Sequence, residues 1–214
     1  MKILLVDDHQ MMRDGLRAVL AREPDLEVIG EAADGHEAIA AARALAPDAV
    51  VMDISMPGLN GLEATRAIVA EHPGMKVVGL SINADRRYVH ALFAAGAAGY
   101  LLKNCAAEEL VLALRAVARG QTYVSPAVAG AVVQGFLGHA DAPAPLAPIE
   151  LSAREREVLQ LLAEGHTSKD AAARLGVALS TVETYRRQIM TKLGIHSIAA
   201  LTKYAIRHGL TTVD

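Results

Sequence analysis

Short apolar segments alternate with longer amphipathic segments along the first 120 residues of the chain. The apolar segments cover residues 3–6, 27–30, 49–52, 77–80 and 99–102. The amphipathic segments lie between and after them, at about 10–22, 36–45, 61–71, 85–95 and 106–119. In the second of these, Ala38, Ile39, Ala42 and Leu45 recur at helical spacing. The alternation predicts five βα units, and therefore a parallel sheet with helices on both faces and right-handed crossovers.

The third apolar segment ends in a single carboxylate. Residues 49–52 form a short, largely β-branched run, and Pro57-Gly58 breaks regular structure shortly afterwards. This pattern is typical of a strand that is covered on both faces. Asp53 is therefore expected at the carboxyl end of a central strand, where open α/β sheets bind their ligands. Taken alone, the residue equally fits the capping of a loop.

Polar residues also follow three of the other predicted strands. Asp7 and Asp8 follow the first strand, Ser81 follows the fourth and Lys103 follows the fifth. In the flavodoxin-like strand order 2-1-3-4-5, strands 1 and 3 flank the crevice, so that the three carboxylates share one cleft. Singly, these residues are ordinary loop acids, a capping serine and a solvated lysine. Their joint placement favours a functional site.

Three crowded carboxylates raise each other's pKa unless a cation neutralises them. A hard divalent ion with oxygen ligands is suited to this task, and Mg²⁺ leaves coordination positions open for water and phosphate. Lys103 supplies a charge opposite to that of a phosphoryl group, and Ser81 supplies a hydroxyl donor. The set predicts that a carboxylate attacks phosphorus while the cations neutralise the phosphoryl oxygens.

These residues resemble the signature of bacterial response-regulator receiver domains. The resemblance rests on Asp7-Asp8, the Asp53-Ile-Ser-Met-Pro-Gly segment, Ser81 and Lys103, and it covers residues 1–120. It implies that a sensor histidine kinase phosphorylates Asp53.

The resemblance also implies a metal site and a switch. Asp8 and Asp53 would bind Mg²⁺ directly together with the carbonyl of Ser55, and Asp7 would help through water. Ser81 and Tyr100 would form the switch pair, with Tyr100 three residues before Lys103. Ser81 stands where many relatives have Thr, and the substitution keeps the hydroxyl.

The chain changes character after residue 120. Residues 121–149 are expected to form a linker in which 127–137 allow a short apolar helix. Pro143, Pro145 and Pro148 then favour a semi-extended spacer. The boundary between two domains is therefore expected between residues 138 and 150.

The last part of the chain, residues 150–214, has the pattern of four short helices. Helix start signals with a hydroxyl residue followed three positions later by an acid occur at 152–155, 167–170 and 180–183. Residues 197–207 complete the set. Short helices joined by glycine-containing turns suit a helix-turn-helix, although the helix pattern alone favours a plain interaction bundle.

The third of these helices has one apolar face and one polar face. The apolar face carries Val182, Ile189 and Leu193. The polar face carries Ser180, Thr184, Arg187, Gln188 and Thr191, with Glu183 beside it. Arg reads guanine, Gln reads adenine and Glu accepts from cytosine in a DNA major groove. At the edges, Arg186, Lys192 and Lys169 suit phosphate contacts. A solvated helix face explains the same residues equally well.

A second resemblance decides between these interpretations. The segments Leu151-Ser-Ala-Arg-Glu155-Arg-Glu157, Thr181-Val-Glu183-Thr184-Tyr-Arg186 and Ile189-Met-Thr-Lys192-Leu193 look like a LuxR-type DNA-binding domain at about 150–208. The whole chain is thus similar to the NarL/FixJ subfamily of response regulators. The DNA-contacting residues that this implies are Lys169, Ser180, Thr181, Glu183, Thr184, Arg186, Arg187 and Lys192.

Three positions depart from the family pattern. Ala178 stands where a helix-capping Ser is frequent, so that Ser180 is expected to cap the helix instead. Ala171 replaces a larger aliphatic residue. Glu183 stands where many relatives have Lys, which affects its predicted base contact.

The combined expectation is an α/β receiver of five parallel strands followed by an all-α helix-turn-helix domain. Phosphorylation of Asp53 would control formation of a homodimer and binding to a double-stranded DNA operator, and thereby transcription. An enzyme is not expected. A phosphatase of the haloacid-dehalogenase type needs an acid where this chain has Ser55, and the sequence contains no Walker-type loop.

Composition adds three limits. The first 146 residues carry 12 basic and 17 acidic residues, and the remainder carries 9 and 7, so that only the second part is suited to a polyanion. The single cysteine excludes an internal disulfide, and no two histidines are four residues apart to form a transition-metal pair on a helix. No apolar run approaches the ~20 residues that span a bilayer, and a cytoplasmic protein is expected.

Overall fold

The computed structural model describes residues 1–82, 84, 86–105, 107–137, 151–207 and 210–211. It consists of two compact units, Met1–Ala140 and Asp141–Asp214. The prolines of the expected spacer, Pro143, Pro145 and Pro148, lie outside the described residues. Among the described helices, none is both long and apolar enough to cross a membrane.

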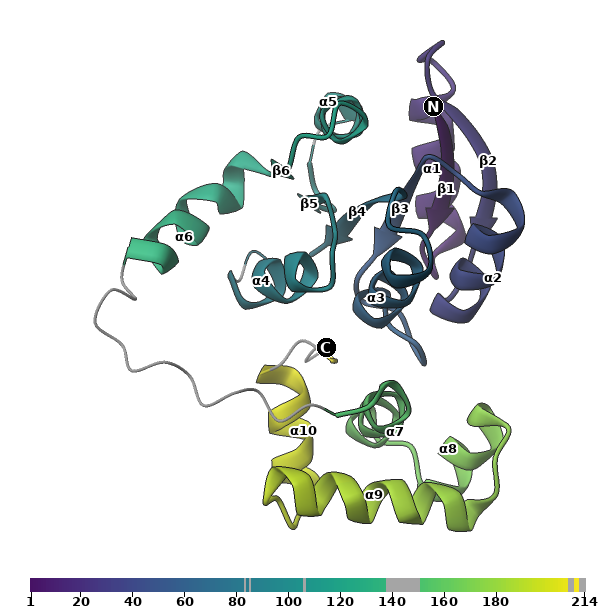
Figure 1. The fold of residues 1–214 in the computed structure, drawn as a ribbon, viewed down its shortest axis with the longest axis vertical. Helices are drawn as coiled ribbons and strands as arrows, with labels where there is room; N and C mark the ends of the chain where they lie inside the picture. The colour runs from purple at the N-terminus through teal and green to yellow at the C-terminus, as the bar shows by residue number, and fades with distance from the viewer. Residues whose placement is uncertain (83, 85, 106, 138–150, 208–209, 212–214) are drawn as a thin grey trace. The chain divides into compact units, whose positions relative to one another are not determined.

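The first unit is built on a parallel sheet with the strand order β2-β1-β3-β4-β5-β6 (Figure 1). The strands are β1 (Lys2–Val6), β2 (Glu27–Ala32), β3 (Ala49–Asp53), β4 (Lys76–Ser81), β5 (Gly99–Leu102) and β6 (Tyr123–Val124). Alternate residues of the central strands face opposite sides of the sheet. The predicted order 2-1-3-4-5 is confirmed, and a short sixth strand extends it.

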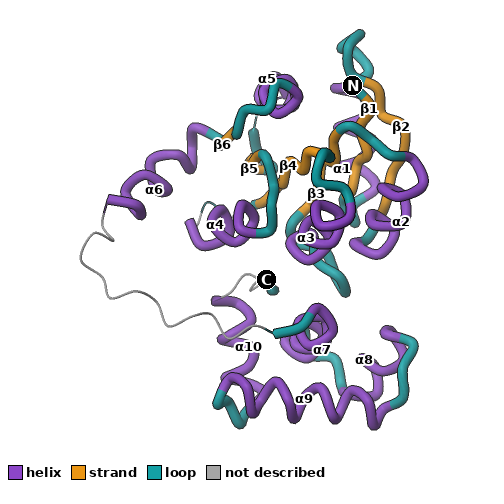
Figure 2. Tube along the Cα trace, viewed as in Figure 1, coloured by secondary structure: helices purple, strands orange, loops and turns teal. Residues whose placement is uncertain are grey.

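Helices cover both faces of this sheet (Figure 2). They are α1 (Gln10–Leu20), α2 (Gly35–Leu45), α3 (Gly61–Glu71), α4 (Arg86–Ala94), α5 (Ala107–Ala118) and α6 (Pro126–Leu137). Leu5 and Val51 face the core shared with α1 and α5, whereas Leu4 and Val50 face the core shared with α2 and α3. The five predicted βα units and the two-sided covering are therefore confirmed.

The segment after α5 differs from the expected linker. Tyr123–Val124 pairs with β5, and α6 follows with Pro126 at its first position, where proline needs no amide partner. Val128 on α6 is fully buried. A two-residue strand carries too few residues for a hydrophobic period to reveal it, and for this reason the sequence predicted a linker from residue 121.

The second unit is a bundle of four helices. These are α7 (Ala153–Ala163), α8 (Ser168–Leu175), α9 (Leu179–Leu193) and α10 (Ile198–Arg207). Their shared core contains Val158, Leu159, Val182, Ile189 and Leu201, which are all fully buried. The predicted four-helix architecture is confirmed.

Two of the three predicted helix starts have the expected chemistry. Ser152 with Glu155 and Thr167 with Asp170 form complete capping boxes. The third prediction, that Ser180 caps α9, is wrong. Ala178 already has the extended backbone of an N-cap, with φ −68° and ψ 149°, so Ser180 lies inside the first turn. Because Ala178 has no side-chain acceptor, α9 begins without a side-chain cap.

Candidate functional site

The carboxyl ends of β1 and β3 bring two aspartates together. The strands are adjacent, with Val6 opposite Met52, so that Asp7 and Asp53 emerge side by side. Both side chains are fully buried. The sheet register thus brings these two carboxylates together at the edge of the sheet where the strand order predicted them.

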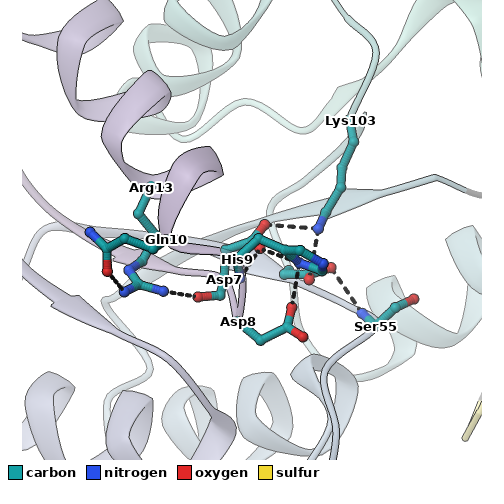
Figure 3. Close-up of polar contacts among 8 residues, drawn as sticks. Asp7, Asp8, His9, Gln10, Arg13, Ser55 and Lys103 are labelled. Carbon is teal, nitrogen blue, oxygen red and sulfur yellow. Dashed lines mark hydrogen bonds and ion pairs between the residues drawn. The ribbon is translucent and has the colours of Figure 1, made fainter.

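Lys103, which follows β5, joins these two carboxylates, and Figure 3 shows its side chain extending toward Asp7. Its Nζ lies 2.8 Å from Oδ2 of Asp53 and 2.8 Å from Oδ2 of Asp7. The backbone amide of Ser55 donates a 3.0 Å hydrogen bond to Oδ1 of Asp53. Each oxygen of Asp53 therefore has a donor, one from a side chain and one from the backbone.

Burial determines the electrostatics of this cluster. Burial raises the pKa of Asp53 to about 6, and the charge of Asp7 adds to the rise, whereas Lys103 and the Ser55 amide oppose it. For Lys103, burial lowers the pKa, but the hydrogen bonds and charges of Asp53 and Asp7 outweigh it and raise the pKa above its ordinary value. One ammonium is thus shared by two carboxylates that would otherwise repel each other.

An acidic pocket of the kind that binds Mg²⁺ is formed around Asp53. Asp7, Asp8, His9 and Asp53 offer ligand atoms that all lie within 4.8 Å of one another. Oδ2 of Asp7 lies 2.8 Å from Nζ of Lys103, and Oδ1 of Asp8 lies 2.8 Å from Nδ1 of His9. Clustered carboxylate oxygens of this kind fit a hard cation, which prefers oxygen ligands.

His9 belongs to this pocket although the sequence analysis did not single it out. Its Nδ1 lies 2.8 Å from Oδ1 of Asp8 and 3.2 Å from Oδ1 of Asp7, and its side chain is 70% exposed. The available signal was its position directly after the aspartate pair, at the start of α1.

Arg13 is a second residue of this site that the sequence pattern does not reveal. Its Nη1 donates a 2.6 Å hydrogen bond to the carbonyl of Asp7, and its Nε donates one of 3.0 Å to Glu31. Arg13 is buried, which is unusual for a charged residue of an amphipathic helix. It fixes the backbone from which Asp7 and Asp8 project.

The expected switch residues lie on adjacent strands. Ser81 ends β4 at the edge where the acidic pocket lies, and it pairs in register with Leu102. Tyr100 is two residues deeper along β5, in an apolar cluster that contains Leu92 of α4 and Val128 of α6. Both Ser81 and Tyr100 are fully buried.

The second unit presents the polar helix face that the sequence predicted. Val182 and Ile189 of α9 are fully buried. The residues exposed on this helix include Ser180, Thr184, Arg187, Gln188 and Thr191. Thr184 donates its hydroxyl to the carbonyl of Ser180 at 2.8 Å. Glu183 lies beside this face with its Oε1 3.8 Å from Nη1 of Arg186.

Two edge residues have different surroundings. Lys169 is exposed on α8, as a phosphate contact requires. The Nζ of Lys192 instead donates a 2.7 Å hydrogen bond to Oε2 of Glu155 on α7.

Comparison with known proteins gives the same division of the chain. Residues 3–115 match the family described as "Response regulator receiver domain". Residues 150–205 match "Bacterial regulatory proteins, luxR family".

Similar proteins span the full length of the chain. The response regulator UvrY of Escherichia coli O157:H7 is 37% identical over 212 residues, which cover 99% of this chain and 96% of UvrY. The oxygen regulatory protein NreC of Staphylococcus haemolyticus is 40% identical over 214 residues, with 98% and 99% covered.

Solved structures agree. A LuxR-family two-component response regulator from Aurantimonas sp. SI85-9A1 has a TM-score of 0.62 and 36% identity, and it covers 64% of this chain and 97% of its own. A complex of the response regulator RcsB with DNA has a TM-score of 0.60 and 25% identity, and it covers 97% of this chain and 98% of its own. The chain therefore belongs to the NarL/FixJ subfamily of two-component response regulators, in which a receiver domain precedes a LuxR-type DNA-binding domain, and it is a transcription regulator and not an enzyme.

Proposed function

We propose that a sensor histidine kinase in the cytoplasm phosphorylates Asp53 and that this phosphorylation controls DNA binding by the second unit. The observation that carries the proposal is the meeting of Asp53, Asp7 and Lys103 at the carboxyl edge of the sheet. A buried carboxylate held beside a shared ammonium is suited to become a negatively charged acyl phosphate.

The transfer is a displacement at phosphorus. A carboxylate oxygen of Asp53 attacks the phosphorus of a phosphohistidine, and the P–N bond breaks. The electron pair of that bond goes to the imidazole nitrogen, which then takes a proton from water. Lys103 moves from the carboxylate to a phosphoryl oxygen, and the hydroxyl of Ser81 donates to another.

The same pocket would hold Mg²⁺. We assign direct ligands to Asp8, Asp53 and the carbonyl of Ser55, and a water-mediated contact to Asp7. The ligand atoms of Asp7, Asp8 and Asp53 lie within 4.8 Å of one another, which supports this assignment. When bound, the ion neutralises charge on the phosphoryl oxygens during transfer.

Phosphorylation changes the pocket by charge. The phosphoryl group carries roughly −1.5 to −2 charges if it resembles those on other side chains, in place of the single negative charge of the ionised carboxylate. We propose that Ser81 and Tyr100 respond as the switch pair, that the surface around α4 and α5 then changes shape, and that phosphorylation favours a homodimer. One similar structure is described as two RcsB dimers bound to two parallel DNAs, which supports a dimeric active form.

Helix α9 is the proposed DNA reader. Its exposed polar face would enter the major groove, where Arg187 reads a base edge. The other proposed contacts are Lys169, Ser180, Thr181, Glu183, Thr184 and Arg186. A symmetric dimer would read two related half-sites.

Labelling with radioactive acetyl phosphate in the presence of Mg²⁺ tests the phosphoacceptor. Wild-type protein and the control Asp14→Asn, which changes an exposed carboxylate on α1, are expected to incorporate label to the same level. Asp53→Asn is expected to incorporate none. Label on Asp53→Asn at the wild-type level would remove Asp53 from this role.

Affinity for a DNA duplex selected by the wild-type protein tests the reader. Arg187→Ala is expected to weaken binding by about 1–3 kcal/mol. Lys203→Ala, which changes an exposed residue of α10, is the control and should bind as wild type. If no version of the chain binds any duplex in a salt-sensitive way, the second unit is an interaction bundle instead.

A further inference from the structure

We propose that Lys192 is a positioning residue, which holds helix α9 against α7 through the buried carboxylate of Glu155 and does not contact a DNA phosphate. This inference rests on the DNA-binding function proposed above. It replaces the phosphate contact that the sequence predicted for Lys192.

Glu155 has an unusual environment for an acidic residue of a small domain. It is 2% exposed, and its Oε2 accepts two hydrogen bonds of 2.7 Å, from Nζ of Lys192 and from the backbone amide of Ser152. Burial alone would raise the pKa of Glu155, but the donors Lys192 and Ser152 outweigh it and lower the pKa. The carboxylate is therefore charged at neutral pH and needs the ammonium as its partner.

The position of Lys192 on α9 agrees with this role. At 3.6 residues per turn, Lys192 lies about 60° from the buried Ile189, whereas Arg187 lies about 160° from it. Lys192 thus projects from the flank of the helix that adjoins the core, and Arg187 projects from the exposed face. The side chain of Lys192 is 43% exposed, yet its charged end reaches a carboxylate whose side chain is 3% exposed.

Leaving this pair for a phosphate would be unfavourable. If Nζ moved to DNA, Glu155 would remain as a buried charge without its cation, which is a costly state. A lysine that is free in solution has no such penalty. Lys192 is therefore a poor phosphate ligand and an effective tether.

The tether adjoins the residues proposed to read DNA. A shallow open pocket between α7 and α9 is lined by Ser152, Glu155, Arg187, Gln188, Thr191 and Lys192. Arg187 and Gln188 thus line the same pocket as the Lys192–Glu155 ion pair. A shift of the last turns of α9 would move their side chains relative to a bound base pair.

The same oxygen also connects two parts of the domain. Ser152 is the N-cap of α7, and Lys192 is in the last turn of α9. One carboxylate oxygen therefore ties the start of the first helix to the end of the DNA-reading helix. The orientation of α9 depends on this contact as well as on the apolar core.

The test uses the full-length chain and two duplexes, one selected by the wild-type protein from a randomised pool and one of random sequence. Lys192→Met removes the positive charge and keeps the length of the side chain. Glu155→Gln removes the negative charge and keeps the shape of the side chain, and the double variant removes both charges. Lys203→Met, on the exposed side of α10, is the matched control. Binding is measured over a range of salt concentrations at a temperature where circular dichroism shows every variant to be folded.

A positioning role predicts a loss of specificity. Lys192→Met should bind the selected duplex about tenfold more weakly, which is close to the loss of one base contact. Its affinity for the random duplex and its salt slope should match those of the control. Glu155→Gln should weaken binding to the selected duplex to a similar extent, and the double variant should bind it about as weakly as either single variant, because all three lack the same contact.

A phosphate contact predicts the opposite pattern. Lys192→Met would then weaken binding to both duplexes equally and reduce the salt slope by about 0.9. Glu155→Gln, which frees the ammonium for the phosphate, would then bind at least as tightly as wild type. Either of these results overturns the positioning role. The role is also overturned if Lys192→Met and Glu155→Gln lower the stability equally but leave the ratio of the affinities for the selected and random duplexes unchanged. Failure of the wild-type chain to bind either duplex would instead contradict DNA binding itself.

Discussion

The backbone amide of Ser125 donates a 2.9 Å hydrogen bond to the carbonyl of Tyr100. This bond continues the pairing of β6 with β5, and it leaves Ser125 buried beside the strand that carries the proposed switch tyrosine. Three residues later, Val128 enters the apolar cluster around Tyr100. Strand β6 and helix α6 are thus part of the receiver. Because α6 packs against Tyr100, a movement of Tyr100 would require a movement of α6.

Substitution of Val128 tests how firmly α6 is held. Val128→Ala removes two buried methyl groups, and it should lower the free energy of unfolding by about 2 kcal/mol. Urea unfolding of the full-length chain, followed by circular dichroism, measures this change. Val133→Ala on the same helix is the control, because Val133 is 56% exposed and its truncation should cost less than about 0.5 kcal/mol. Equal effects of the two substitutions would show that α6 does not pack as described.

Removing the charge of Asp53 should stabilise the metal-free protein at neutral pH. Its pKa in the folded state is about 6, above the ordinary value of 3.8, so the folded protein holds this proton more tightly than the unfolded chain does. Its contribution to stability is therefore fully present below about pH 4 and is lost as the pH rises through about 6.

Asp53→Asn, which cannot ionise, should exceed wild type by about 1–3 kcal/mol at pH 8 with a chelator present. At pH 4 the two proteins should differ much less, and saturating Mg²⁺ should reduce the difference at pH 8. Asp14→Asn, on the exposed side of α1, should show no such pH dependence. A gain that is equal at pH 4 and pH 8 would contradict the linkage.

Lys103 should oppose the metal while it assists the phosphoryl group. Its ammonium lies 2.8 Å from both Asp7 and Asp53, so Lys103→Met removes a cation that competes with Mg²⁺. Mg²⁺ affinity measured by titration calorimetry should rise about three- to tenfold, whereas labelling by acetyl phosphate should slow. Lys76→Met, at the opposite end of the sheet, is the control for a general change in net charge. Weaker Mg²⁺ binding by Lys103→Met would mean that Lys103 holds the pocket together.

The fold of the receiver and most of its candidate site could be predicted from the sequence, because the charged residues of the site directly follow the strands. Asp7, Asp53 and Lys103 each follow a buried apolar run, and parallel strands carry the residues after such runs to one edge of the sheet. The contributions of His9 and Arg13 could not be read in the same way. They depend on the direction in which individual side chains leave α1 and its N-cap, and no period in the sequence encodes that direction.

Contacts between residues far apart in the sequence could not be predicted either. Glu155 was predicted as a capping residue and Lys192 as an edge lysine, and each assignment used only neighbours along the chain. Their contact joins positions 37 residues apart and requires the packing of α9 on α7. Likewise, Gly61 gave no sequence signal, yet a Cβ at this position would collide with the carbonyl oxygen of Asp53. Glycine is therefore needed where α3 returns to the strand that carries the proposed phosphoacceptor.

The uncapped start of α9 offers a gain of stability. Ala178 has the backbone of an N-cap but no side-chain oxygen, so the first amides of the helix lack the acceptor that a hydroxyl would supply. Ala178→Ser should raise the free energy of unfolding of the second unit by about 1 kcal/mol. Ala173→Ser, at an exposed position inside α8, is the matched control, and it should be slightly destabilising because serine is a poorer helix former than alanine. Urea unfolding of the full-length proteins compares them, and an equal or lower stability of Ala178→Ser would indicate that water already satisfies these amides.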